Sequence, residues 1–227
     1  MKRSVIAFVR GYRSELLLCT FTAQMLLSPL ADNRPRFGAV LAAVLMLLVL
    51  AGASYMASQR IVRLVVIPLA MLWLIARLLE AFGHGRYFYS HLAPIVGLGL
   101  SLVVLWGILS RFGSIPLVTR SVISEAFVSY LVIAISFSQI YWILNRVLAI
   151  PFNQSIPASQ TSELLYFSMI TLSSLGYGFI VPLNPYVRLI AAFESMIGIF
   201  YIAVVVLAAG RVISASNSPQ PRIAPIR

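Results

Sequence analysis

Two glycines flank a tyrosine in the stretch Ser174-Leu175-Gly176-Tyr177-Gly178, inside a chain whose residues are 60% hydrophobic. Glycine adopts backbone angles that other residues avoid, so these positions allow successive carbonyl groups to turn to one side. A row of carbonyl oxygens along a narrow path can replace the hydration shell of an ion. The chemistry that this stretch suggests is therefore coordination of a cation by the backbone, without a catalytic side chain.

The elements around this stretch indicate how it is held. A short apolar run, Ser162 to Ser173, precedes it. About a dozen residues are too few to cross a bilayer, which takes roughly 20. Non-helical backbone at membrane depth is tolerated only where protein buries it or where it lines a water-filled path. A half-helix that enters from outside points its C-terminus inward, and the partial negative charge of that end favours a cation. These features predict a re-entrant pore helix and a filter loop, without specifying potassium.

The composition predicts a polytopic membrane protein. Charged residues make up only 10% of the chain, whereas soluble proteins average roughly 25%. The net charge of +11 comes from basic residues that lie between apolar runs, as in cytoplasmic anchors that face anionic lipid. We therefore predict membrane lipids as partners and no nucleic acid. Cys19 is the one cysteine, and His84 and His91 flank a single loop, so we predict no enzyme and no cofactor.

The apolar runs predict an all-α membrane protein with six transmembrane helices and the pore helix and filter between the fifth and sixth. The predicted spans are Glu15–Ala31, Gly38–Ser58, Leu64–Phe82, His91–Phe112, Ser121–Val147 and Tyr186–Ile213. We divide the chain into a basic interfacial segment (1–14), a four-helix region (15–113), a pore domain (114–213) and a disordered tail (214–227).

The distribution of basic residues predicts a multi-pass protein of the cell (inner) membrane with both termini in the cytoplasm. Eleven of the 17 Lys and Arg residues fall on the predicted cytoplasmic side and six on the other, which follows the positive-inside rule. The eleven are Lys2, Arg3, Arg10, Arg13, Arg60, Arg63, Arg111, Arg120, Arg211, Arg222 and Arg227, and the six are Arg34, Arg36, Arg77, Arg86, Arg146 and Arg188.

The segment Tyr166–Pro182 resembles the pore-loop signature of potassium channels. In that family an aromatic pore helix leads into Thr-Thr-Val-Gly-Tyr-Gly-Asp, with a proline three residues on. Gly198 lies twenty residues after Gly178, where bacterial members often have a hinge glycine. The resemblance covers about Arg120 to Ile213, and the first four spans are only loosely similar to small bacterial six-span channels.

The resemblance implies a homotetramer, because one chain supplies one filter strand and four are required. It implies that Ser174 to Gly178 form the filter, that potassium binds there and at no other metal site, and that Gly198 is a gating hinge. Ser174 replaces the usual threonine and keeps a hydroxyl that can face the innermost ion site. Leu175 replaces valine and leaves a carbonyl in the path.

The main departure from the signature is Phe179, where the family usually has Asp. In the family this Asp hydrogen-bonds to an aromatic donor of the pore helix, but the matching residue here is Phe167, which cannot donate. We therefore predict a filter held by apolar packing instead of a polar contact, with Phe167, Thr171, Phe179 and Glu194 as its supports. This departure leaves selectivity open between potassium and other monovalent cations.

Glu194 allows two interpretations, because it lies four residues before Gly198 on roughly the same helix face. It is either a charge in the pore cavity that concentrates cations, or a buried carboxyl hydrogen-bonded behind the pore helix to Ser168 or Thr171.

The function predicted from these features is a passive potassium channel. It is not classically voltage-gated, because the fourth span carries only Arg111, at its end, and voltage sensing needs several charges within the field. A less selective monovalent cation channel is the first alternative. A non-conducting subunit or a potassium transporter component is the alternative from another class, although such transporters carry several pore loops and this chain has one.

Overall fold

The structure is a computed structural model that describes residues 13–33, 38, 60–81, 86–112, 120–157 and 160–216. The named elements of this part are all helices, and an isolated β-bridge joins Phe152 to Pro182. The helices are α2 (Arg13–Asn33), α4 (Arg60–Ala81), α5 (Arg86–Phe112), α6 (Arg120–Val147), α7 (Thr161–Leu172) and α8 (Pro185–Ser216).

These helices begin and end within a few residues of the predicted runs. The short run predicted at Ser162 to Ser173 is α7, and the last run continues as helix to Ser216, three residues into the predicted tail. The predicted second span lies outside the described residues except for Gly38, as do most of the basic N-terminal segment, His84 and the tail from residue 217.

Within the described residues, three helices are long and apolar enough to cross a membrane. They contain the segments Leu92–Ser110 in α5, Ile123–Val147 in α6 and Pro185–Leu207 in α8, while α4 has a shorter apolar segment, Leu64–Leu79. The all-helical class and the membrane-capable helices agree with the sequence analysis. The count of six spans stays a prediction.

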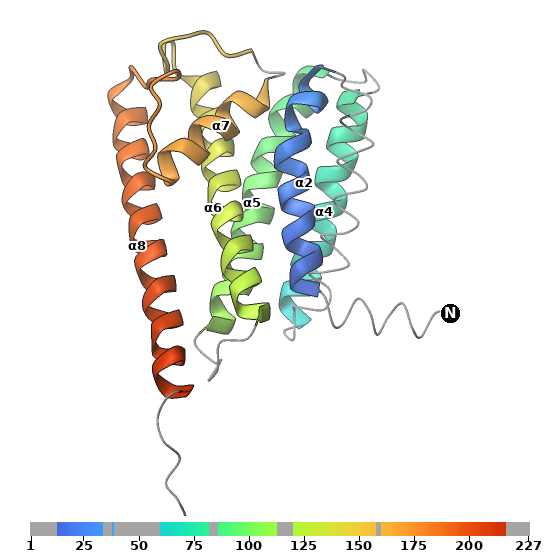
Figure 1. Cartoon of the computed structure of the whole chain (residues 1–227). Coiled ribbons are helices and arrows are strands. Elements are labelled where there is room, and N and C mark those ends of the chain that lie inside the picture. Colours follow the sequence, from blue (N-terminus) through green and yellow to red (C-terminus); the bar gives the residue numbers. More distant parts are fainter. Residues whose placement is uncertain are drawn as a thin grey trace, which may run out of the picture.

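The helix α6 stands at the centre of the molecule (Figure 1), with α5 and α2 on one side and α8 on the other, and α7 crosses near the upper end from α2 toward α8. Side chains from α2, α4, α5 and α6 form one apolar core, and its buried members are Leu17, Phe21, Val66, Ala70, Leu100, Ile108, Val128 and Val132. The helices α2 and α5 pack directly against α6, and α4 packs against α5. These three helices, α2, α4 and α5, are called the front helices below.

The helix α7 lies near one end of the bundle between α6 and α8 (Figure 1). Its aromatic residue Phe167 is buried and meets two other rings edge-on, Tyr141 of α6 at 4.9 Å and Phe152 of the following loop at 5.2 Å between centroids. Such edge-to-face pairs contribute about 0.5–1.5 kcal/mol each beyond the area they bury. This aromatic cluster fixes one face of α7 against α6.

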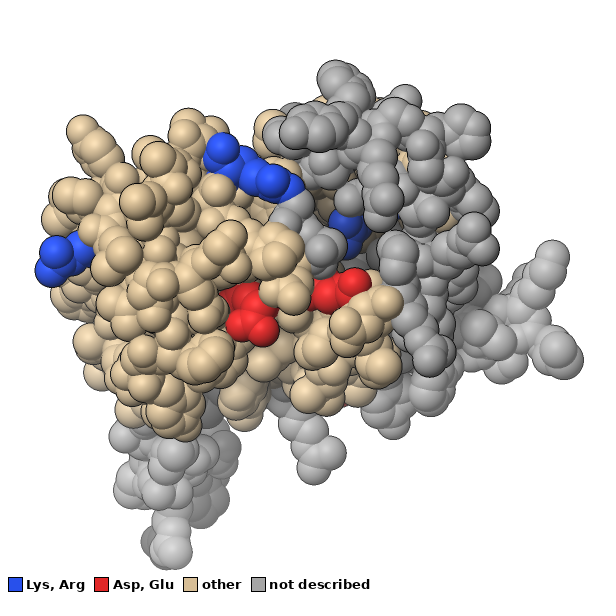
Figure 2. Space-filling model, turned by 90° about the horizontal axis from the view of Figure 1, so that it is seen from above, with Lys and Arg blue, Asp and Glu red and all other residues tan. Residues whose placement is uncertain are grey.

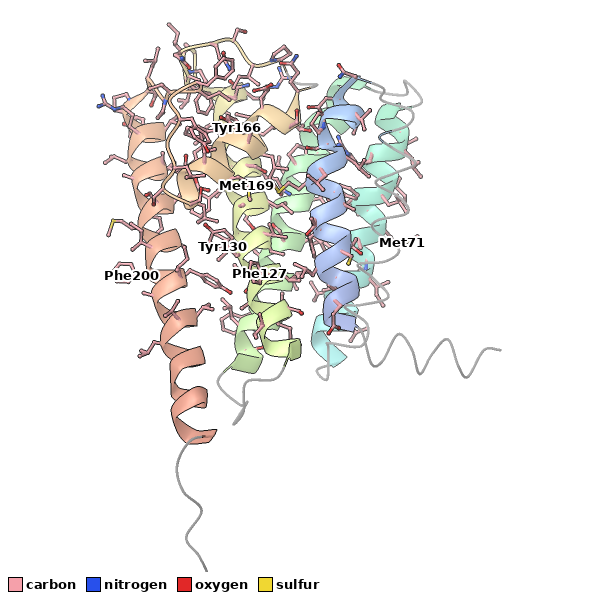
Figure 3. The ribbon with its side chains drawn as sticks, viewed as in Figure 1. Met71, Phe127, Tyr130, Tyr166, Met169 and Phe200 are labelled. Carbon is pink, nitrogen blue, oxygen red and sulfur yellow. The ribbon has the colours of Figure 1, made fainter. Side chains whose placement is uncertain are left out.

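The helix α8 stands at the edge of the molecule with most of its apolar surface open. Only 11% of its segment Pro185–Leu207 is buried, against 50% of Ile123–Val147 in α6. Figure 3 shows Phe200 on the side of α8 that faces away from α6, whereas Tyr130 projects from α6 toward α8. A helix that is apolar on all sides needs lipid or further protein around it.

The contact between α7 and α8 depends on Gly198. A Cβ atom added at Gly198 would lie 1.8 Å from the carbonyl oxygen of Leu172, the last residue of α7. No real side chain fits at this distance, so the two backbones approach each other only because position 198 is glycine. The spacing of Gly198 from the filter thus has a packing reason in addition to the hinge role that the resemblance implies.

We expect Gly198→Ala to separate α8 from α7 and to lower the free energy of unfolding by about 1–3 kcal/mol, the usual cost of overpacking. The matched control is Gly99→Ala, because a Cβ at Gly99 would meet its nearest neighbour, Leu69 Cδ2, at an ordinary 3.5 Å. Thermal unfolding of the purified variants, followed by circular dichroism, measures the difference. Equal midpoints for the two variants would contradict the close approach.

Candidate functional site

The backbone of the predicted filter alternates between two conformations. The φ angles of Ser174, Gly176 and Gly178 are positive, at 59°, 55° and 80°, and among the described residues Ser174 is the only residue other than glycine with a positive φ. Leu175 and Tyr177 between them have ordinary negative φ. Such alternation brings successive N–H groups to one side of the chain, and the carbonyl groups then face the other side.

The hydrogen bonds of this stretch show that its N–H groups face the end of α7. The N–H of Ser174 donates to the Thr171 carbonyl (3.0 Å), and the N–H groups of Leu175 and Gly176 both donate to the Ile170 carbonyl (2.9 and 3.3 Å). The N–H and C=O of one planar trans peptide unit point in opposite directions. The carbonyl oxygens of Ser173, Ser174 and Leu175 are therefore directed away from α7.

The side chains of the filter are open in the single chain. Leu175 is 59% exposed and Tyr177 is 70% exposed, and neither belongs to the cores around α7. Ser174 also presents its hydroxyl to α8, where its Oγ lies 3.0 Å from the Oγ of Ser195. The filter is thus attached to its own chain through N–H groups and one hydroxyl contact, while its large side chains remain uncovered.

The outer end of the filter is held by Asn153, which the sequence analysis did not identify. Its Nδ2 donates to the Phe179 carbonyl (3.1 Å), its Oδ1 accepts from the Val181 N–H (2.9 Å), and its own N–H donates to the Val181 carbonyl (2.9 Å). The prediction of apolar packing in place of polar contact is therefore wrong for this end. Phe179 itself is 63% exposed, and the apolar anchor is the next residue, Ile180, which is buried against the aromatic cluster.

Two predicted supports lie in α7 and act in different ways. Phe167 is part of the aromatic cluster described above, whereas Phe179 is exposed and is not part of that core. The hydroxyl of Thr171 donates back to the Phe167 carbonyl (2.8 Å), and its carbonyl accepts the N–H of Ser174. Thr171 thus supports the filter through its backbone.

Glu194 lies behind α7, which is the second of the two interpretations from the sequence. Its side chain is fully buried and receives a hydrogen bond from the hydroxyl of Tyr141 on α6 (2.6 Å). Ser168 of α7 lies 2.5 Å from its other carboxyl oxygen and also donates to the Ala134 carbonyl of α6 (2.8 Å). The carboxyl therefore joins α6, α7 and α8 at one point. Ser168 is one of the two partners that the sequence suggested, and Tyr141 was not foreseen.

The part of the chain that contains this site matches a known family. Residues 123–215 match the family model described as an ion channel, which covers α6 from Ile123 onward, α7, the predicted filter and α8 as far as residue 215. The comparison with curated proteins found no match, and neither did the comparison with solved structures. The family match supports an ion channel in general.

We expect Asn153→Ala to loosen the outer end of the filter. The variant removes two hydrogen bonds from side chain to backbone, each contributing about 0.5–1.5 kcal/mol, so amide hydrogen exchange in the segment 176–183 should rise roughly tenfold. Asn184→Ala is the matched control, because the Asn184 side chain accepts from the Tyr186 N–H at the start of α8 and not from the filter. Exchange at the wild-type rate in Asn153→Ala would argue against the clamp.

We expect Glu194→Gln to fold and to keep the unitary conductance of the wild type, because the amide preserves the shape and the acceptor for Tyr141. Glu194→Ala leaves a cavity and the Tyr141 hydroxyl without its partner, and should lower the free energy of unfolding by about 3–5 kcal/mol. Glu163→Gln, in the first turn of α7, is the control for loss of a charge. A large fall in conductance in Glu194→Gln at unchanged stability would instead support a charge in the pore cavity.

Proposed function

We propose that this chain is one subunit of a passive potassium channel in the cell membrane, with potassium coordinated by backbone carbonyls of Ser174 to Gly178. The observation that carries the proposal is that the N–H groups at the start of the filter lie on one side of the backbone and the carbonyl groups on the other. These N–H groups point to the end of α7, so the carbonyls opposite them are available to an ion. Passive conduction needs no catalytic residue and no cofactor, so potassium enters only as the permeant ion.

The exposed surfaces support a tetramer. Non-helical backbone and its carbonyls cannot face hydrocarbon, but they can line a water-filled path enclosed by protein. Three further copies around a common axis would enclose the carbonyls and cover Leu175, Tyr177 and the open apolar face of α8. A closed ring of identical subunits also matches the need for four filter strands.

The front helices support gating without a classical voltage sensor. The segment Leu92–Ser110 of α5 contains no Lys or Arg, and Arg111 follows at its end. A charge that moves through the whole field contributes about 2.3 kcal/mol per 100 mV, and α5 offers no array of such charges. We therefore propose that conductance depends only weakly on voltage. The excess of Lys and Arg on the predicted inner side supports the separate proposal that both termini lie in the cytoplasm.

A monovalent cation channel of relaxed selectivity is the second candidate. The observation in its favour is the outer end of the filter, where an exposed Phe179 stands in place of the family's Asp and Asn153 binds only the main chain. Reversal potentials in mixed potassium and sodium solutions separate the two candidates. A non-conducting subunit or a transporter component would give no channel currents at all.

The test is ion flux through purified protein in liposomes. We expect potassium flux that exceeds sodium flux, and we expect Gly176→Ala to reduce it at least tenfold, because φ at this position is +55° and a side chain there adds roughly 1–2 kcal/mol of strain in each subunit. Gly99→Ala is the control with ordinary helical geometry. An absence of flux in the wild type, with the protein folded and inserted, would contradict the proposed function.

A further inference from the structure

We propose that Asp32 at the end of α2 is a positioning residue for the filter, because it caps the N-terminus of the pore helix α7. This inference rests on the proposed function for its effect on conduction, but the capping contact stands on the geometry alone.

Both carboxylate oxygens of Asp32 accept hydrogen bonds from the first turn of α7. The hydroxyl of Thr161 donates to Oδ1 (2.9 Å) and the backbone N–H of Ser162 donates to Oδ2 (2.8 Å). The first four N–H groups of a helix lack partners within the helix and usually bind a side chain at the N-cap position. In α7 the N-cap residue is Gln160, whose side chain makes no capping bond. Asp32 provides this cap from a helix about 130 residues away in sequence.

The charge of Asp32 suits α7 and does not suit its own helix. Asp32 is in the last turn of α2, where the partial negative end of the helix disfavours a carboxylate. The partial positive N-terminus of α7 stabilises the same carboxylate. The end of α2 and the start of α7 lie near the upper end of the molecule in Figure 1. Figure 2 views this end from above and shows acidic side chains on its described surface. The interaction with α7 therefore explains a carboxylate at position 32, where Asp32 connects the end of α2 to the start of α7.

The helix α7 transmits a displacement at one end to the filter at the other. It has 12 residues and so spans about 18 Å at 1.5 Å per residue. Its last carbonyls, at Ile170 and Thr171, hold the N–H groups of the filter. The middle of α7 is fixed to α6 and α8 through Ser168. A displacement of the first turn of α7 would therefore rotate the helix about this point. A movement of α2 relative to α6 would then change the direction of the filter carbonyls.

The contact lies within one chain, so each set of front helices acts on the filter strand of its own subunit. A cavity of about 130 Å³ lies where these helices meet, because residues of α2, α4, α5 and α6 line it together with Thr161 and Leu165 of α7. This arrangement assigns a role to the front helices in setting the filter, beyond separating the pore from lipid.

The first test is hydrogen exchange in the full-length purified protein. Loss of an N-cap side chain costs about 1 kcal/mol, which corresponds to a roughly fivefold change. We expect exchange in the first turn of α7 to be about fivefold faster in Asp32→Ala. It should be close to wild type in Asp32→Asn, because the Asn amide can accept from Ser162 and donate to Thr161. The control is Glu163→Gln, which removes a charge from the same turn without touching the contact to α2.

The second test is conduction by the same variants in liposomes. We expect Asp32→Ala to lower both potassium flux and the potassium-to-sodium permeability ratio about fivefold, and Asp32→Asn to restore both. If Asp32→Ala does not assemble, Thr161→Val replaces it, because this variant removes one of the two hydrogen bonds and leaves the Ser162 contact.

The outcomes separate this inference from the proposed function. Wild-type exchange in Asp32→Ala overturns the cap, and faster exchange with unchanged flux and selectivity overturns the positioning role. If the wild type conducts no ions, the proposed function fails, and exchange in the segment 174–178 then decides the inference. Faster exchange there in Asp32→Ala supports positioning of the filter, and an unchanged rate overturns it.

Discussion

The structure depends on one constraint, which is that the polar backbone groups of the non-helical segment after α7 need partners. The N–H groups at the start of the filter meet this need through the carbonyls of Ile170 and Thr171, which are themselves among the orphan groups at the end of a helix. One set of contacts thus satisfies two sets of unpaired groups. What remains is the opposite edge of the filter, where carbonyls are available for a cation. The position and direction of α7 therefore decide where those carbonyls point.

Several contacts with different chemistry hold α7, and this explains how a strained filter persists. Ser174 adopts a left-handed conformation that costs a residue other than glycine about 1–2 kcal/mol. Each hydrogen bond that fixes the segment contributes about 1 kcal/mol, so the bonds to α7 offset the strain. The buried carboxyl of Glu194 then joins α7 to α8, and Gly198 allows the two helices to approach closely enough for this contact. The glycine and the carboxyl are therefore parts of one support.

The sequence predicted the local features of this site well, because they depend on residues near one another in the chain. The length of α7, the glycines of the filter, and Ser168 and Thr171 as the candidate partners of Glu194 follow from spacing and periodicity. Asn153, Tyr141 and Asp32 were missed because their roles arise from contacts between distant segments. Periodicity gives the exposed face of a helix but not the register of its neighbours. A polar loop containing Pro151-Phe152-Asn153 before the pore helix was the one available signal for the clamp.

The clamp at Asn153 changes the meaning of Phe179. A side chain that contacts the pore helix restricts the residue after the filter to one chemistry, whereas Asn153 binds the main chain at Phe179 and Val181. Main-chain contacts do not depend on the side chain at position 179, so the outer end keeps its conformation while Phe179 remains exposed. In the proposed tetramer, the side chain at this position could then contact a neighbouring subunit or the solution at the pore entrance. Phe179 is therefore compatible with an ordered backbone, because Asn153 of the loop before α7 provides the polar contact.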